Sequence, residues 1–220
     1  MIRLLSFADL ISITNAIFGF FSIITIFLNE FHLAFSFILI AILADGLDGI
    51  VARKIRKSNI GDYLESMGDM ASLGIAPSIF IFGIYYNSIS YNSYYEIYLI
   101  SSLIIYLFLG LIRLASFHTI KDKKYFVGLP ASASTIFIII LGKLNINFVY
   151  MIFIIIILSV LMVSPINFPK MNVKLNLIAA ILMLFSILNI DFLKTYPILL
   201  LFTAVLIYSI AGPIFLKVNT

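Results

Sequence analysis

Long apolar runs separated by short polar segments cover almost the whole chain. Each run is near the length of about 17 to 25 residues that a helix needs to cross the hydrocarbon core of a membrane. The pattern predicts an all-α integral membrane protein, a bundle of about eight transmembrane helices within one domain over residues 1–220. The expected spans are residues 8–28, 32–53, 60–86, 95–117, 126–142, 146–165, 173–190 and 196–216.

The composition supports a membrane location. The chain is 63% hydrophobic and 11% charged, with a mean hydropathy of +1.17, which is more apolar surface than a soluble domain needs. It has no cysteine, so disulfides and thiolate metal sites are excluded. The formal charge of +4 is modest and its basic residues are dispersed in loops. This distribution argues against a nucleic-acid partner and for a role in membrane topology.

The lysine and arginine positions predict the orientation. If the N-terminus is cytoplasmic, 11 of the 14 basic residues lie in inside segments, only Lys143 and Lys194 lie outside, and Arg113 lies within a span. This bias places both termini in the cytoplasm. The start, MIRLLSF, has no small-residue cleavage site, so we expect an uncleaved first helix. A small, uncleaved chain favours a prokaryotic plasma membrane.

An acidic cluster interrupts the apolar pattern. Five of the ten acidic residues lie between Asp45 and Asp69, a few turns below the predicted cytoplasmic surface. We expect two helices joined by a turn near Lys57 and Ser58, with Asn59 as the N-cap of the second helix. The helical period then gives two faces, one with Asp45, Asp48, Gly49, Ala52 and Arg53 and the other with Gly61, Glu65 and Asp69. In an antiparallel hairpin, Asp45 is level with Asp69, and Asp48 with Glu65.

Four converging carboxylates predict a divalent-metal site. Burying them costs on the order of 10 kcal/mol on insertion scales. Arg53 and Arg113 could pair with them and help the helices associate, but two cations do not balance four anions. Hard oxygen ligands favour two Mg²⁺ or Mn²⁺ ions, an arrangement suited to phosphoryl transfer. Gly49 and Ala52 leave room for a phosphate-bearing ligand, and Arg53 can bind phosphate through its fork of donors.

These residues resemble the signature of the CDP-alcohol phosphotransferases, D-x-x-D-G-x-x-A-R, then seven or eight residues, then G-x-x-x-D-x-x-x-D. Here the signature covers residues 45–69 and has one departure, because Glu65 occupies the position of the family's third aspartate. Glutamate keeps the charge but reaches one methylene further. The matching residues are Asp45, Asp48, Gly49, Ala52, Arg53, Gly61, Glu65 and Asp69.

The resemblance implies a role for each of these positions. The four acids, Asp45, Asp48, Glu65 and Asp69, would hold two divalent cations that bind the diphosphate of a CDP-activated lipid. Asp69 would also act as general base on the acceptor hydroxyl, which attacks the lipid-linked phosphorus and releases CMP. The family implies a homodimer among membrane lipids. The positions that would border the cytidine nucleotide are Gly49, Ala52, Arg53 and Gly61.

The acceptor alcohol is predicted from weaker signals. SLGIAPS (72–78), RLASF (113–117) and GLPASAS (128–134) resemble the membrane-embedded phosphatidylserine synthases within this family, which implies L-serine. Serine needs about one cation for its carboxylate, and Arg113 is the candidate, with interfacial snorkelling or a helix-end cap as the alternatives. Asn15, a buried amide on the first span, either meets the CDP-lipid or only bonds a neighbouring helix.

Two other functions remain compatible with the sequence. One is the same chemistry on another alcohol, such as glycerol 3-phosphate or inositol phosphate, although an acceptor with its own phosphate would need several cations near the metals. The other is a cation transporter with an acidic site in the membrane. Against transport, the acids lie toward one membrane face and are accompanied by the glycine, alanine and arginine of a diphosphate site.

Overall fold

The structure is a computed structural model that describes residues 5–51, 58–89, 93–117, 125–188 and 195–219. The all-α expectation is confirmed, because helices make up nearly all of this described part. They are α1 (Phe7–Phe27), α2 (Phe31–Val51), α3 (Gly61–Asp69), α4 (Ala76–Ile89), α5 (Ser93–Phe117), α6 (Ala131–Lys143), α7 (Phe148–Met162), α8 (Val173–Leu188) and α9 (Tyr196–Asn219).

Helices α3 and α4 belong to one continuous rod, joined by the π-helical segment η2 (Met70–Ile75). Four helical stretches of the described residues are long and apolar enough to cross a membrane: Ala8–Phe27, Gly61–Tyr86, Tyr94–Ser116 and Tyr196–Leu216. Four shorter apolar helices accompany them: Phe31–Leu47, Ala131–Lys143, Phe148–Met162 and Lys174–Leu188.

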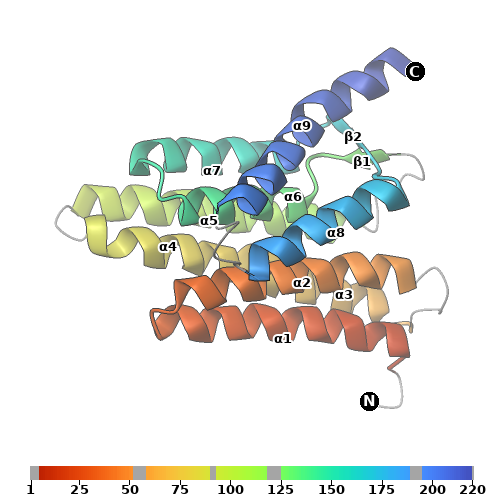
Figure 1. Cartoon of the computed structure of the whole chain (residues 1–220), viewed down its shortest axis with the longest axis horizontal. Helices are drawn as coiled ribbons and strands as arrows, with labels where there is room; N and C mark the ends of the chain where they lie inside the picture. The colour runs from red at the N-terminus through yellow and green to blue at the C-terminus, as the bar shows by residue number, and fades with distance from the viewer. Residues whose placement is uncertain (1–4, 52–57, 90–92, 118–124, 189–194, 220) are drawn as a thin grey trace.

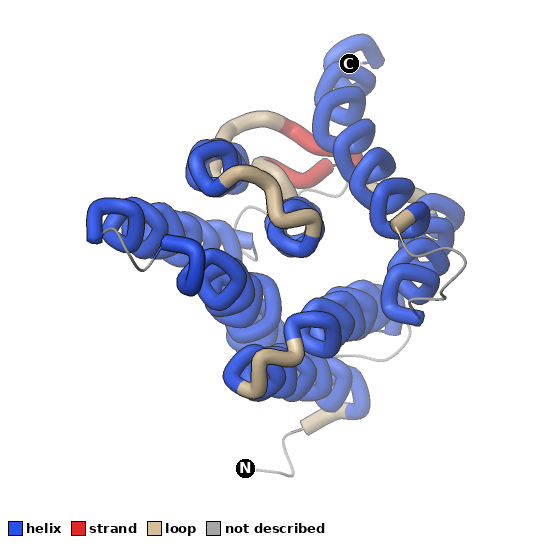
Figure 2. Tube along the Cα trace, turned by 60° about the vertical axis from the view of Figure 1, so that its left-hand side comes forward, coloured by secondary structure: helices blue, strands red, loops and turns tan. Residues whose placement is uncertain are grey.

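The helices form two groups crossed by a third (Figure 1). Helices α1 and α2 pack side by side, with the α3–η2–α4 rod against α1, while α5, α6 and α7 form the second group. Helices α8 and α9 cross this arrangement, and α9 is steeply inclined to the rest. The more end-on view of Figure 2 shows the helices arranged around the core. Fully buried Phe35, Phe80 and Ile138 bring α2, α4 and α6 together there.

Helix α1 begins at a reciprocal cap. The backbone N–H of Ser6 donates to Oδ2 of Asp9 at 2.8 Å, and the backbone N–H of Asp9 donates to the Ser6 hydroxyl at 3.3 Å. This capping box satisfies two backbone donors that have no partner within the helix. Asp9 is fully buried and also lies against Ser58, which precedes α3. The cap therefore ties the start of α1 to the start of the α3 rod.

The predicted N-cap of the second acidic helix is wrong. Ile60, not Asn59, occupies the N-cap position of α3, and no side chain caps it. The Ser58 hydroxyl instead accepts from the backbone N–H of Ile60 at 3.2 Å, and the Ser58 carbonyl accepts from Gly61 at 3.1 Å. Ser58 thus closes a local turn before the helix, which serine hydroxyls do readily. The predicted turn residue Lys57 lies outside the described residues.

Two expected spans are too long at one end, because α6 begins at Ala131 and α7 ends at Met162. Residues near the start of the predicted span 126–142 and just after the predicted span 146–165 form short strands, β1 (Tyr125–Val127) and β2 (Asn167–Pro169), which pair antiparallel. The apolar composition of Tyr125–Val127 does not distinguish a strand from a helix end, whereas Asn167–Pro169 lies between two expected spans. The physical reason for the strands is therefore the pairing itself, which satisfies backbone groups of both segments.

Gly128 makes the turn from β1 toward α6 possible. Its φ is +78°, a conformation that side chains disfavour, and its N–H donates to the carbonyl of Ile166 at 2.7 Å. A Cβ at this position would also collide with the carbonyl oxygen of Met162. The close approach of two backbones thus ends the helical pattern here.

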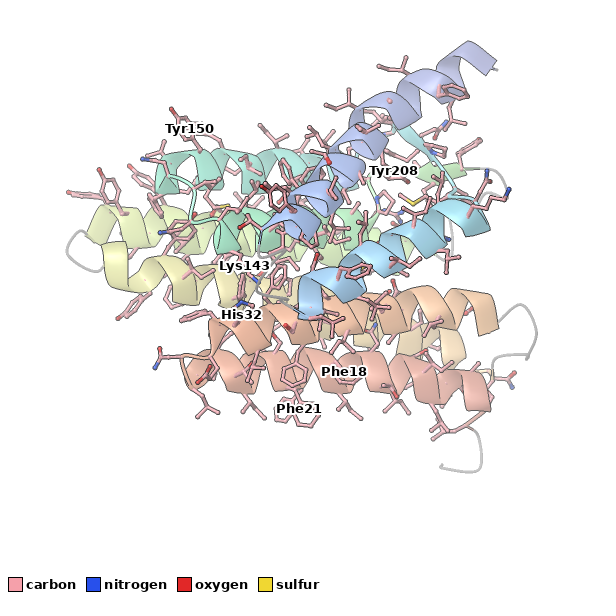
Figure 3. All side chains as sticks on the ribbon, in the orientation of Figure 1. Phe18, Phe21, His32, Lys143, Tyr150 and Tyr208 are labelled. Carbon is pink, nitrogen blue, oxygen red and sulfur yellow. The ribbon has the colours of Figure 1, made fainter. Side chains whose placement is uncertain are left out.

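Lys143 ends α6 at a sheltered position. Its ammonium lies 4.0 Å from the centroid of the Phe35 ring and near His32 (Figure 3). An ammonium over a ring face is a cation–π arrangement. The charge of Lys143 is thus held against α2. The expected span ended at residue 142 and put Lys143 in a loop, whereas the structure makes it the last residue of α6.

Candidate active site

Helix α1 runs against α3 and η2 at backbone distance. A Cβ built on Gly68 would lie 2.8 Å from the carbonyl oxygen of Ser12, and one built on Gly19 would lie 2.8 Å from Cα of Ser72. Real Cβ atoms do not approach other atoms so closely, so both positions require glycine. Small residues that allow such approaches are typical of helix interfaces in membranes. The two contacts keep α1 in parallel register with the α3–η2 segment.

This register brings Asn15 to Asp69. Asn15 lies between the two close contacts on the same face of α1, and its Nδ2 donates to Oδ1 of Asp69 at 2.8 Å. Both side chains are buried, with 2% of Asn15 and 8% of Asp69 exposed. A hydrogen bond to a carboxylate fixes both distance and orientation. Asn15 therefore sets the position of the Asp69 carboxylate.

We expect Gly68→Ala to damage this interface. The new methyl group would press on the Ser12 backbone, which can move only with α1, and overpacking of this kind costs about 1–3 kcal/mol. The variant should show a lower thermal unfolding temperature in detergent and reduced turnover. Gly110→Ala is the matched control, since its Cβ would make only an ordinary contact, 3.8 Å from Met162. Equal stability of the two variants would contradict the role of Gly68.

Three of the predicted carboxylates converge. Asp45 of α2 and Glu65 and Asp69 of α3 each offer one oxygen, and the three oxygens lie within 4.8 Å of one another. Asp69 is buried, whereas Asp45 and Glu65 are partly exposed. Packing of α2 and α3 on the common neighbour α1 produces this convergence. The structure thus places Asp45 beside Asp69, as the spacing predicts.

The donor set fits a divalent cation. Carboxylate oxygens are the preferred ligands of Mg²⁺ and Mn²⁺, and ligands of one Mg²⁺ ion at about 2.1 Å lie within about 4.2 Å of each other. The observed spread of 4.8 Å needs only small side-chain rotations to reach such a geometry. Like charges this close also repel unless a cation lies among them. Asp45, Glu65 and Asp69 are therefore suited to share a metal ion.

The structure describes the remaining signature residues only in part. Asp48 and Gly49 belong to the last turn of α2, but their side-chain surroundings lie outside the description. Ala52 and Arg53 lie outside the described residues altogether. Gly61 is buried and starts α3. The assignments of these residues to metal and nucleotide remain predictions.

Arg113 lies in α5 at the depth of the carboxylates. The hydroxyl of Tyr106, also in α5, lies 3.2 Å from the carbonyl oxygen of Leu73 in η2. Helix α5 runs antiparallel to the α3 rod, so Arg113, two turns beyond Tyr106, is level with residues near Glu65. Its side chain is 8% exposed and lies within electrostatic range of Tyr208 in α9. The guanidinium is thus held inside the bundle, which does not support the snorkelling alternative.

Sequence reasoning missed three residues and one backbone segment around this site. Asp9 was not singled out, although an acid in an apolar span is itself a signal. Tyr106 and Thr135 were missed as well, and they bond to the η2 backbone directly after Asp69. The polar hydroxyl of Tyr106 in an apolar run was a visible signal for it. For the π-helical segment the signal was Pro77, which has no N–H for the carbonyl of Leu73 four residues earlier.

Comparison with known proteins assigns the family. Residues 5–216 match the family model described as CDP-alcohol phosphatidyltransferase. The chain belongs to the CDP-alcohol phosphatidyltransferase family. This confirms the family expected from the signature, and it makes the protein a transferase of phospholipid biosynthesis.

Several curated relatives resemble this family member over most of its length. A CDP-diacylglycerol–serine O-phosphatidyltransferase of Methanocaldococcus jannaschii is 31% identical, covering 76% of each chain. An archaetidylserine synthase of Methanothermobacter thermautotrophicus is 33% identical over 74% of this phosphatidyltransferase and 70% of the relative. A CDP-diacylglycerol–serine O-phosphatidyltransferase of Helicobacter pylori is 31% identical over 97% of this chain and 93% of its own.

Proposed function

We propose that this phosphatidyltransferase moves a phosphatidyl-type group from a CDP-activated lipid to the hydroxyl of L-serine and releases CMP, yielding phosphatidylserine or archaetidylserine. The observation that carries the proposal is the convergence of Asp45, Glu65 and Asp69 at signature spacing. The three relatives described above, all named for products or acceptors containing serine, support the choice of acceptor.

Four acids would hold the divalent cations: Asp45, Asp48, Glu65 and Asp69. When bound, two Mg²⁺ or Mn²⁺ ions neutralise the CDP diphosphate and the charge that develops on the leaving CMP. The number of ions and the place of Asp48 rest on the family signature, whereas the shared site of the other three rests on their convergence.

Asp69 would serve as the general base. Asn15 holds its carboxylate through Oδ1, which keeps the group oriented while its charge remains available for a proton. The serine hydroxyl oxygen attacks the phosphorus linked to the lipid, and its proton passes to Asp69. The bond from that phosphorus to the bridging oxygen of the diphosphate breaks, and CMP leaves. Atoms and charge balance without an additional reactant.

Residues around the acids would bind the rest of the substrates. Gly49, Ala52, Arg53 and Gly61 are proposed to border the cytidine nucleotide, and Asn15 to contribute from α1. The buried position of Gly61 at the start of α3 is consistent with a close approach of the nucleotide to the backbone. Arg113 is proposed to bind the serine carboxylate, because it is charged, enclosed by protein and level with the acids.

We further propose a single domain with about eight transmembrane helices and both termini in the cytoplasm. The shorter helices α2, α7 and α8 would cross the membrane as well, since each exposes large apolar side chains, among them Leu33, Phe153 and Leu177. The lysine and arginine bias supports an active site that faces the cytoplasm. A prokaryotic plasma membrane and a homodimer complete the proposal.

The decisive test measures CMP release by the purified protein from a CDP-activated lipid with Mn²⁺ or Mg²⁺. The acceptors are serine, glycerol 3-phosphate, inositol phosphate or none. Release that requires serine supports the proposal. Release with another alcohol would keep the reaction class and contradict the acceptor. No release with any acceptor, in a protein shown to be folded, would favour cation transport instead.

Glu65→Asp should retain substantial activity. Aspartate is the residue of the family signature at this position, and the change keeps the charge while shortening the side chain by one methylene. Glu65→Gln is the matched comparison, because it keeps the length and removes the charge, and we expect a loss of about 10- to 100-fold. Turnover and the Mn²⁺ concentration for half-maximal rate should be measured in both. Complete loss in Glu65→Asp would show that the site requires the longer side chain.

A further inference from the structure

The π-helical segment η2 begins directly after the proposed base. Asp69 is the last residue of α3, and η2 covers Met70–Ile75 before α4 begins. A π-helix bonds each N–H to the carbonyl five residues back rather than four, so it inserts one extra residue into a helix. One extra residue rotates the side chains before the insertion by about 100° about the helix axis, relative to the side chains after it. The segment therefore lets Asp69 face α1 while Phe80 and Ile81 of α4 face the core.

The Leu73 carbonyl in η2 is held by two other helices. The Thr135 hydroxyl, from α6, donates to the Leu73 carbonyl oxygen at 2.8 Å. The Tyr106 hydroxyl, from α5, lies 3.2 Å from that oxygen and 3.2 Å from the Thr135 hydroxyl. Because Thr135 gives its proton to Leu73, the single proton of Tyr106 is shared between these two acceptors. All three residues are buried.

These hydrogen bonds stabilise the π-helical form of the segment. The Leu73 carbonyl has no α-helical donor, because the residue four positions later is Pro77, which lacks an N–H. A buried carbonyl without a partner costs about 1–3 kcal/mol. Thr135 and Tyr106 thus supply the donors that this irregular backbone needs. On the other side of the segment, the close contact of Gly19 with Ser72 holds η2 against α1. The segment is fixed from both sides.

We infer that Thr135 and Tyr106 are positioning residues that hold Asp69 in its reactive orientation through the Leu73 carbonyl and the π-helical segment. They act on the backbone four residues after Asp69 and are not catalytic themselves. This inference rests on the proposed role of Asp69 as base and metal ligand. It adds α5 and α6 to the elements that shape the active site.

The test is a double-mutant cycle with Thr135→Val and Tyr106→Phe, which remove hydroxyls with little change of shape. Each single variant should lower kcat by about 10- to 100-fold, the usual effect of removing a group that supports a ligand. The KM for the CDP-activated lipid should stay near the wild-type value, while the Mn²⁺ concentration for half-maximal rate rises. The double variant should lose more than the product of the two single losses, because either hydroxyl partly compensates for the other. Thr135→Ser should restore the rate.

Matched controls separate positioning from general stability. Thr25→Val removes a buried hydroxyl that bonds carbonyls of its own helix, and Tyr85→Phe removes one that bonds the Ile146 carbonyl at 2.7 Å. Both controls should reduce the unfolding temperature about as much as the test variants and leave kcat unchanged. Test variants that match the controls in kcat and in Mn²⁺ dependence would overturn the inference.

A second readout distinguishes failure of the inference from failure of the proposed reaction. Wild-type protein without CMP release from any acceptor would contradict the proposed function. The shift in unfolding temperature caused by Mn²⁺ alone then tests the positioning of Asp69. A smaller shift in Thr135→Val and Tyr106→Phe than in Thr25→Val and Tyr85→Phe supports the inference, and equal shifts contradict it.

Discussion

Asp69→Asn should leave the protein folded and able to bind the CDP-activated lipid while turnover falls by about 10²- to 10⁴-fold, the range associated with a general base. The amide oxygen of the new side chain can still accept the hydrogen bond from Asn15, so the contact between α1 and α3 persists. The charge and the ability to take a proton are lost, whereas an amide oxygen remains in place and the other proposed ligands, Asp45, Asp48 and Glu65, would still hold the cations that bind the diphosphate. Single-turnover CMP release and lipid binding measured on the same preparation separate these two effects.

The control for this change is Asp62→Asn. Asp62 lies on the same helix, is exposed and is outside the group of converging carboxylates. The substitution Asp62→Asn changes the net charge by the same amount as Asp69→Asn. Because it leaves the converging carboxylates intact, we expect near wild-type turnover. Wild-type turnover in Asp69→Asn would remove Asp69 as the base, and unfolding of that variant would show that its charge is needed for structure.

Removal of divalent cations should abolish CMP release, and addition of Mn²⁺ or Mg²⁺ should restore it. Without a cation, the carboxylates of Asp45, Glu65 and Asp69 repel one another within 4.8 Å and repel the diphosphate of the substrate. Metal binding should therefore also raise the unfolding temperature, since a ligand that binds only the folded state stabilises it. Both effects are measured with excess chelator followed by titration of each metal.

The control uses the same chelator saturated beforehand with Mg²⁺, which tests for effects of the chelator itself. Full activity in excess free chelator would exclude the metal-dependent mechanism. Loss of activity that only one of the two metals restores would identify the ion that this site prefers.

The part of the site that was predictable depends on local periodicity. The spacing of Asp45, Glu65 and Asp69 fixes their faces on two helices, because the helical period is a property of the backbone. A metal site on these faces follows from the cost of burying like charges. The helix start at Ser58 to Gly61 was misplaced, because serine and asparagine compete for turn and cap positions with similar energies.

Other parts depended on contacts between distant segments. The strands at Tyr125–Val127 and Asn167–Pro169 stabilise each other only as a pair, because each satisfies backbone groups of the other. The partner of Asn15 was left open between nucleotide and protein, and the structure shows Asp69, 54 positions along the chain. Backbone contacts at Gly68 and Gly19 set that pairing.

The sequence by itself determined the membrane class, the approximate helices, the acidic face and the family, since these follow from local apolar length, helical period and signature spacing. The tertiary structure alone decided how the π-helical segment after Asp69 is anchored at Leu73. Pro77 marks the irregularity locally, because it cannot donate to the Leu73 carbonyl four residues earlier. The donors that take its place, the hydroxyls of Thr135 and Tyr106, are far away in the chain, and no local pattern records them.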